Sequence, residues 1–301
     1  MAEPLRPLST GALLDRAVRF YRRNVLLFAG IAVPMLLIAV ISEAVNLATG
    51  AAPVLPAAPV PGQLPHIDWL RFGILLTLLI LVGAIVGAYV AGATVEAVSH
   101  LELGESATIG ACYREVSRRV APVIGVNLLV AILAVAPTML GFLAMFLIAN
   151  VSPIAGALAA VLVLAGIVVS FWILLRLIVV VPAVVLERPG VAGAIRRSAA
   201  LTKGFMGRVL LVLLAAICVY FAISFVFSLA AGVVMVATRS LRAVQWTAFG
   251  GSCVSTLVVT PLITIAFTLL FFDLKVRKEG FDLDLLLRRG QSPSATDAAS
   301  L

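Results

Sequence analysis

The stretch VAGAIRRSAALTKGFMGR at residues 191–208 carries four basic residues and leads directly into an uncharged apolar run that begins at Val209. Residues 11–23 and 110–119 have the same character, because each starts with Gly-Ala, contains several arginines and is followed by an apolar segment. Copies spaced by about 80–100 residues predict an internal repeat. Each unit is predicted to be a basic amphipathic helix at the membrane surface that precedes spanning helices.

The composition is typical of an integral membrane protein. Of the 301 residues, 62% are hydrophobic and only 12% are charged, whereas soluble domains carry about 25% charged residues. Several apolar runs are long enough to cross a hydrocarbon core of about 30 Å, and the mean hydropathy is +1.17. An ordinary soluble domain is therefore excluded. Nucleic acid is not the expected partner of the +8 net charge, since the basic residues flank apolar runs with few aromatic residues among them.

The predicted fold class is all-α, with six transmembrane helices in three repeats of one interfacial amphipathic helix plus two spans. The spans are placed at about residues 25–48, 72–98, 121–149, 154–181, 209–237 and 246–272. They form a single polytopic membrane domain over residues 1–290, followed by a disordered cytoplasmic tail at residues 291–301, which are small and polar. Loops are expected at residues 49–67, which are rich in proline, and at residues 238–245.

The distribution of basic residues predicts the topology. With six spans, 18 of the 22 Lys and Arg residues fall on the side that holds both termini, and three fall on the other. The remaining one, Arg176, lies within a span. Because cytoplasmic loops of membrane proteins carry an excess of Lys and Arg, both termini are expected in the cytoplasm.

Three stretches of the sequence together resemble a known family. They are PLRPLSTGALLDRAVRFYRRN at residues 4–24, PAVVLE with AIRRS within residues 182–198, and TLLFFDLKVRKEG at residues 268–280. The combination resembles bacterial multi-span proteins related to the membrane domain of glycerophosphoryl diester phosphodiesterases. In full-length enzymes of that kind, the chemistry belongs to a separate soluble α/β barrel with metal-binding His and Glu residues. The resemblance implies a bacterial cell (inner) membrane module of that type without its hydrolase.

Three charged residues lie within or beside spans. Glu96, Arg176 and Asp273 each come late in a span that runs toward the cytoplasm, so they are expected at similar depth. Charges in a membrane usually pair or mark a pathway. One interpretation is that Arg176 pairs with Glu96 or Asp273 and closes or lines a cytoplasmic-side cavity. The other is that its long side chain extends to the head groups.

The basic amphipathic helices carry the candidate contacts to anionic phospholipid head groups, each basic residue contributing about 1 kcal/mol near a charged surface. The alternative is that these residues only orient the protein during insertion and hold the spans upright. Protein partners are not predicted. The candidate lipid contacts are Arg19, Arg22, Arg23, Arg118, Arg119, Arg196, Arg197, Lys203 and Arg208.

The sequence offers no catalytic signature, so an enzyme is not expected. It contains no Gly-x-Ser-x-Gly, His-Glu-x-x-His or Gly-x-x-x-x-Gly-Lys-Ser/Thr motif, and its three cysteines lack metal-type spacing. His100 is followed by Glu102 and Glu105, but the other histidine, His66, falls on the opposite side of the membrane. Because a metal site needs three or four convergent ligands, we predict neither a metal nor another cofactor.

The leading hypothesis is a non-enzymatic polytopic membrane protein, either a structural or regulatory module or one that interacts with lipid. The alternative is a transporter or permease for a small or lipidic substrate. A third hypothesis is an enzyme that acts on lipid head groups at the cytoplasmic face. A polar cavity reaching mid-membrane would favour transport, a tightly packed bundle with a basic cytoplasmic face would favour the module, and a metal held by His100, Glu102 and Glu105 would favour the enzyme.

Overall fold

The structure is a computed structural model that describes residues 9–49, 69–148 and 152–279. Within these ranges the regular structure is entirely helical, and six helices are long and apolar enough to cross a membrane. The prediction of an all-α fold with six helices of membrane-spanning length and apolarity is confirmed. Most of the expected Pro-rich loop and the expected tail at residues 291–301 lie outside the described residues.

The long helices match the predicted spans closely, except at the ends of the last one. The loop expected at residues 238–245 is much shorter, because Arg239 ends one helix with a left-handed φ of 50° and the next begins at Leu241. That helix also continues through the charged residues to Glu279, beyond the predicted end at residue 272. The six are α2 (Val25–Thr49), α3 (Trp69–Glu102), α5 (Val120–Ile148), α6 (Pro153–Leu177), α9 (Met206–Thr238) and α10 (Leu241–Glu279).

Three short helices precede α2, α5 and α9. They are α1 (Thr10–Arg23), α4 (Ile109–Ser117) and α8 (Val191–Thr202). The side chains of Ser9 and Thr108 cap the first two by accepting hydrogen bonds from the backbone N–H groups of Ala12 and Ala111. The order of one short helix and then two long ones is the predicted order. That the three units are copies of one repeat remains a prediction.

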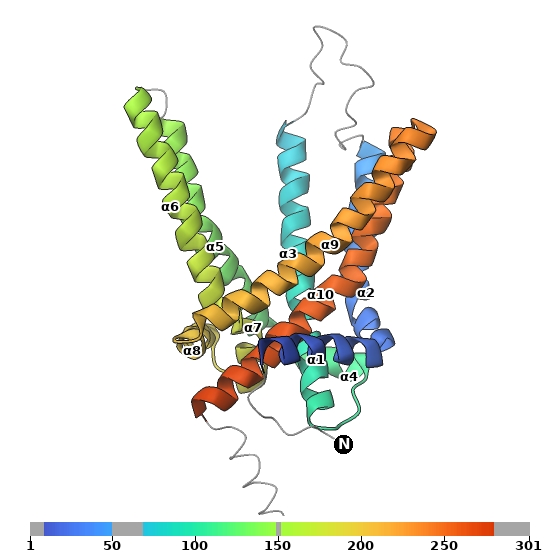
Figure 1. The fold of residues 1–301 in the computed structure, drawn as a ribbon, viewed down its shortest axis with the longest axis vertical. Coiled ribbons are helices and arrows are strands. Elements are labelled where there is room, and N and C mark those ends of the chain that lie inside the picture. The colour runs from blue at the N-terminus through green and yellow to red at the C-terminus, as the bar shows by residue number, and fades with distance from the viewer. Residues whose placement is uncertain (1–8, 50–68, 149–151, 280–301) are drawn as a thin grey trace, which may run out of the picture.

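The long helices form two groups that diverge from a common end (Figure 1). The pair α5 and α6 stands on one side, and α2, α9 and α10 stand on the other, with α3 between them (Figure 1). Between α6 and α8 the chain makes one helical turn, α7 (Val180–Pro182), and a short π-helix, η1 (Ala183–Glu187). These two elements extend the fourth span to Glu187, past the predicted end at residue 181.

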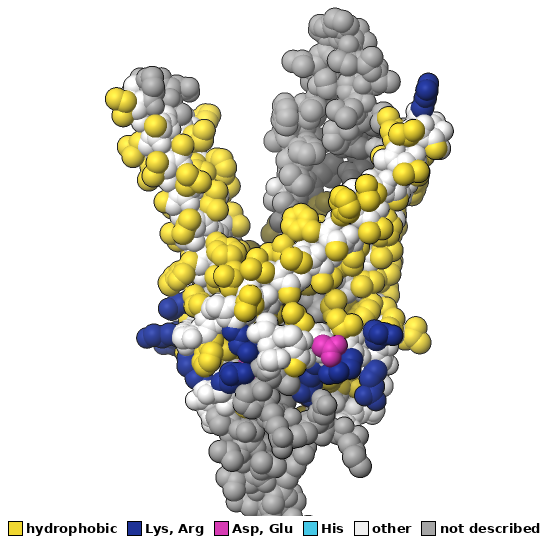
Figure 2. Space-filling view, viewed as in Figure 1, with side chains coloured by type: hydrophobic (Ala, Val, Ile, Leu, Met, Phe, Trp, Pro, Cys, Tyr) yellow, Lys and Arg dark blue, Asp and Glu magenta, His cyan; other side chains and the backbone are white. Residues whose placement is uncertain are grey.

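The buried core lies at the end where α1, α4, α8 and residues 273–279 of α10 gather, which we call the basic end. Leu13, Leu201 and Leu274, from three of these elements, are at most 1% exposed. Away from it, α5, α6 and α9 present large apolar side chains outward (Figure 2). In that view most of the Lys and Arg side chains gather as a band at the basic end, below an apolar surface (Figure 2). Burial of the short helices against the long ones positions the charged residues described next.

Candidate functional site at the basic end

A buried ion pair joins α1 to the end of α3. The guanidinium of Arg16 lies 2.6 Å from the carboxylate of Glu102, and the two side chains are only 6% and 4% exposed. Arg16 shares the buried face of α1 with Leu13 and Ala17, so its charge is carried into the core with that face. Removing one partner of such a pair leaves an uncompensated charge and costs about 3–5 kcal/mol. The pair therefore fixes how α1 docks.

A second buried carboxylate holds the start of α9 against α10. The Asp273 side chain, 2% exposed, lies 2.8 Å from Nε of Arg208 and 3.0 Å from Nε of Arg277. Arg277 is one helical turn beyond Asp273, which helps to keep this charged part of α10 helical.

Glu187 is the centre of a third group, which joins η1, α8 and α10. Its carboxylate accepts hydrogen bonds from Arg197, at 2.7 Å, and lies 2.9 Å from Nζ of Lys275. Arg197 also donates to Glu279, near the end of α10, at 2.7 Å. The hydrogen bonds to Glu279 and Glu187 raise the pKa of Arg197, which is charged throughout the accessible pH range. Lys278 donates to the carbonyl groups of Ala200 and Lys203, so α10 remains docked along α8 to its last turn.

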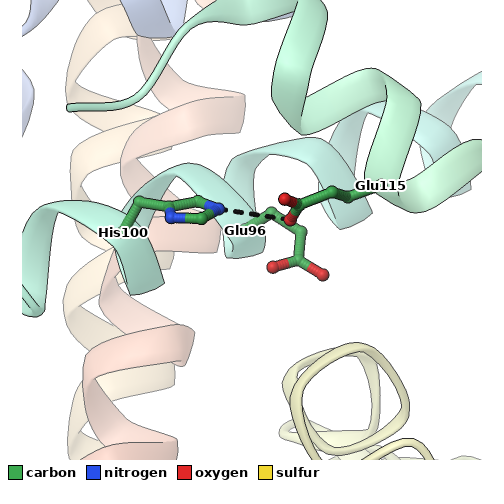
Figure 3. A group of neighbouring side chains, drawn as sticks. All are labelled: Glu96, His100 and Glu115. Carbon is green, nitrogen blue, oxygen red and sulfur yellow. Dashed lines mark hydrogen bonds and ion pairs between the residues drawn. The ribbon is translucent and has the colours of Figure 1, made fainter. Parts of the chain in front are cut away.

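A fourth group surrounds His100. Glu96 and His100 are four residues apart on α3 and therefore share one face of that helix, and Glu115 reaches them from α4 (Figure 3). Nε2 of His100 lies 3.2 Å from a carboxylate oxygen of Glu115, and Nδ1 lies 2.7 Å from one of Glu105. Among the described residues, Glu96, His100 and Glu115 bring three possible metal-ligand atoms within 4.8 Å of one another.

Glu102 and Glu105 are the carboxylates that follow His100 in the sequence and were the ones expected beside it. The structure separates these two carboxylates, since Glu102 turns to Arg16 while Glu105 remains beside His100. The four-residue spacing of Glu96 and His100 was a signal in the sequence that could have identified two of the three residues of the cluster. Glu115 could not have been found in this way, because it joins only when α4 folds back against α3.

Thiol chemistry does not belong to this site. Cys112 is completely buried on α4. Burial, reinforced by the negative charges of Glu115 and Glu96, raises the pKa of its thiol to about 11. The thiolate, which is the form that binds metals and attacks electrophiles, is therefore scarce at neutral pH. Burial likewise raises the pKa of Tyr113 to about 12, and its hydroxyl donates a hydrogen bond to the Ile31 carbonyl.

Of the two interpretations of Arg176, pairing with Glu96 or Asp273 is not seen among the described residues. Asp273 is bound by Arg208 and Arg277, and Glu96 lies with His100 and Glu115, so the three residues are not brought together. Instead, the Arg176 guanidinium lies over the ring of Trp172, 4.7 Å from its centroid. Similar depth is not enough to pair these residues, because pairing also depends on the direction in which each helix face points.

The nine candidate lipid contacts fall into two classes. Arg197 and Arg208 are bound to carboxylates within the protein, as described above, and Arg19 pairs with Asp15 at 2.8 Å on an exposed surface. No ion pair involves the other six within the part of the chain that the structure describes. These six, all exposed except the half-buried Arg119, are Arg22, Arg23, Arg118, Arg119, Arg196 and Lys203.

A cavity of about 470 Å³ lies between α9 and α10, away from the basic end. None of its lining side chains is charged. Only one of its Ser and Thr hydroxyls, that of Thr256, makes a hydrogen bond within the described ranges, to the Ser252 carbonyl. The Ser and Thr hydroxyls that line the cavity are those of Ser224, Ser228, Ser252, Ser255, Thr256 and Thr260.

Comparison of the chain with protein-family models, with curated proteins and with solved structures finds no match. The resemblance to the membrane domain of glycerophosphoryl diester phosphodiesterases therefore remains a prediction from the sequence.

Proposed function

We propose that the protein is a non-enzymatic membrane module whose basic end faces the cytoplasm and binds anionic phospholipid head groups. The observation that carries this proposal is the set of exposed basic side chains that no carboxylate of the described residues neutralises. They come from α1, from α8 and its end, and from the junction of α4 with α5, and so belong to segments far apart in the sequence.

The internal ion pairs support this assignment. Arg16, Arg197 and Arg208 neutralise buried or half-buried carboxylates and hold the short helices in place. The basic residues left over point outward from a fixed scaffold, at the ends of helices that cross the membrane. A cationic surface at that depth is attracted to anionic lipid by about 1 kcal/mol per residue. The excess of Lys and Arg on this side also favours a cytoplasmic orientation, with both termini inside a bacterial inner membrane.

Native mass spectrometry of the full chain released from nanodiscs tests the proposal. The variant with Arg22→Gln, Arg118→Gln and Arg196→Gln is expected to retain fewer phosphatidylglycerol molecules than the wild type. The matched control carries Arg71→Gln, Arg239→Gln and Arg242→Gln, which removes the same charge from the predicted opposite side. Equal retention by the two variants, or equal retention of phosphatidylglycerol and phosphatidylcholine by the wild type, would contradict specific binding at the basic end.

A transporter or permease is the second candidate function, and the cavity between α9 and α10 favours it. Its hydroxyl groups lie in the middle portions of two spans, where a small neutral or lipidic molecule could be hydrogen-bonded. Polar side chains within a membrane commonly line a pathway or a helix interface.

Cysteine accessibility separates a water-filled pathway from a lipid-filled recess. Ser255→Cys is made in a chain whose three cysteines are replaced by alanine, and it is treated with a membrane-impermeant thiol reagent in sealed vesicles. A transport pathway predicts modification of this residue, but not of Val254→Cys, whose parent side chain is outside the cavity lining and 40% exposed. Failure to modify Ser255→Cys from either side would remove the transport interpretation.

A further inference from the structure

We propose that Glu96, His100 and Glu115 bind one divalent transition-metal ion, with Zn²⁺ as the test ion, and that the ion clamps α4 to α3. The proposal is independent of lipid binding, because none of these residues belongs to the exposed basic set. It rests on three features, which are the distances among the ligand atoms, the two contacts of the imidazole ring and the elements that supply the ligands.

The distances suit a common ion. Two ligands of a tetrahedral zinc ion, bound at about 2.0–2.2 Å, lie about 3.3–3.5 Å apart. Nε2 of His100 and the carboxylate oxygen of Glu115 are already 3.2 Å apart. One ligand atom from each of Glu96, His100 and Glu115 lies within 4.8 Å of the other two, so a small side-chain rotation completes a site with three protein ligands. The carboxylate of Glu96 makes no hydrogen bond or ion pair with the described residues that would have to be broken.

The imidazole contacts point to the same site. Each nitrogen of His100 faces a carboxylate, and a carboxylate can only accept a hydrogen bond. Both contacts can be hydrogen bonds only while the ring carries two protons. When an ion takes the place of the proton at Nε2, the contact of Nδ1 with Glu105 is retained. A histidine that binds a metal through one nitrogen and donates the other N–H to a carboxylate is the usual arrangement in metalloproteins.

The donor set and the surrounding charges define the class of ion. One imidazole and two carboxylates suit zinc and its neighbours, whereas Mg²⁺ and Ca²⁺ prefer oxygen donors alone. Arg119 and Arg188 lie near enough for their charges to act on Glu96. Three carboxylates outnumber these two arginines, so the group attracts a cation once Nε2 has lost its proton.

The ligands come from both sides of the loop at residues 103–108, which makes the ion a structural clamp. Two ligands belong to the last two turns of α3 and the third belongs to α4, with the left-handed Gly104 between them (φ 81°). Closing this loop with an ion would hold α4, and with it the start of α5, at a fixed position. We therefore expect bound Zn²⁺ to raise the thermal stability of the protein.

Equilibrium dialysis of the tag-free full chain in nanodiscs, followed by elemental analysis, tests the proposal. The wild type is expected to retain one equivalent of Zn²⁺, and His100→Ala is expected to retain none. Glu105→Gln should weaken the affinity by about 10–100-fold, the usual effect of losing a carboxylate that orients a ligating histidine. The matched control is His66→Ala, which removes the other histidine of the chain and should leave the stoichiometry unchanged.

Two further measurements keep the test decisive if His100→Ala fails to fold. Glu115→Gln keeps the shape of the side chain and should also lose the ion. In the absence of metal, its melting temperature should match that of the metal-free wild type. Co²⁺ bound to the wild type should give visible absorption bands that Glu115→Gln lacks. The proposal is overturned if the wild type shows no saturable one-equivalent binding, or if Glu115→Gln and Glu96→Gln both bind Zn²⁺ as the wild type does. In that case His100 would bridge the two carboxylates through protons alone.

Discussion

The basic end of the bundle contains a buried core, whereas the opposite ends of the long helices leave large apolar side chains exposed. Leu13 and Leu274 are 0% exposed, but Phe146 and Leu147, near the far end of α5, are 80% and 64% exposed. Lipid can solvate an exposed apolar side chain as well as another helix can, so the far ends need little mutual packing. The ion pairs show the same difference between the two ends, since every buried or half-buried ion pair described above lies at the basic end. The comparison indicates that one end of the molecule specifies its structure and that the other mainly crosses the bilayer.

Breaking the buried ion pair should have the largest effect. Glu102→Gln leaves the Arg16 guanidinium in a buried position without its counter-charge. We expect a loss of about 3–5 kcal/mol in the free energy of unfolding, measured by denaturant titration in detergent micelles.

The exposed pair between Asp15 and Arg19 provides the control. Its side chains are 63% and 58% exposed, so Asp15→Asn should change the free energy of unfolding by no more than about 0.5 kcal/mol. If both substitutions cost the same, the basic end is not held by its buried charges.

Truncation of a leucine should have the next largest effect on stability in the buried core and a much smaller one on the exposed surface. Leu270→Ala removes a completely buried side chain from α10, and the cavity left behind should cost about 2–5 kcal/mol. Leu164→Ala, on the outward face of α6 at 62% exposure, should cost much less. Thermal unfolding followed by circular dichroism checks the ranking, and the opposite order would show that the long helices pack through the faces assigned here to lipid.

A smaller effect is expected at a close contact between long helices away from the basic end, that of α5 with α6 at Gly166. A Cβ atom added at Gly166 of α6 would lie 2.5 Å from the carbonyl oxygen of Pro137 on α5, so Gly166→Ala should cost about 1–3 kcal/mol. Gly83→Ala is the matched control, because nothing lies within 4 Å of its Cβ position. Equal melting temperatures for the two variants would mean that α5 and α6 are not in contact at Gly166.

The smallest expected effect concerns the reactivity of Cys112, the native thiol of α4. With its pKa raised to about 11, Cys112 should deprotonate only above the pH at which ordinary thiols do. Alkylation by a small neutral maleimide, followed by mass spectrometry of the peptides, should therefore be negligible at pH 8 and should increase as the pH rises toward 11. Unfolding in denaturant at pH 8 should restore the reactivity. Rapid modification of the folded protein at pH 8 would show that α4 is not buried against α3.

The sequence by itself determined the class of fold and the number of spans. Each span is a local run of apolar residues, and its length against the thickness of a bilayer is enough to recognise it. It also identified where the basic residues concentrate, because they are adjacent in the chain. The end of α10 was misplaced for a related reason, since a local rule ends a span at its first charges while Asp273 and Lys278 are satisfied by distant partners.

Only the tertiary structure decided which charges meet. Arg16 and Glu102 are 86 positions apart, and Glu115 reaches His100 only because α4 folds back along α3. Arg176, Glu96 and Asp273 were grouped by depth, yet each found a different neighbour. The direction of a side chain depends on the rotation of its helix and on the helices packed beside it, and no local pattern of residues contains that information.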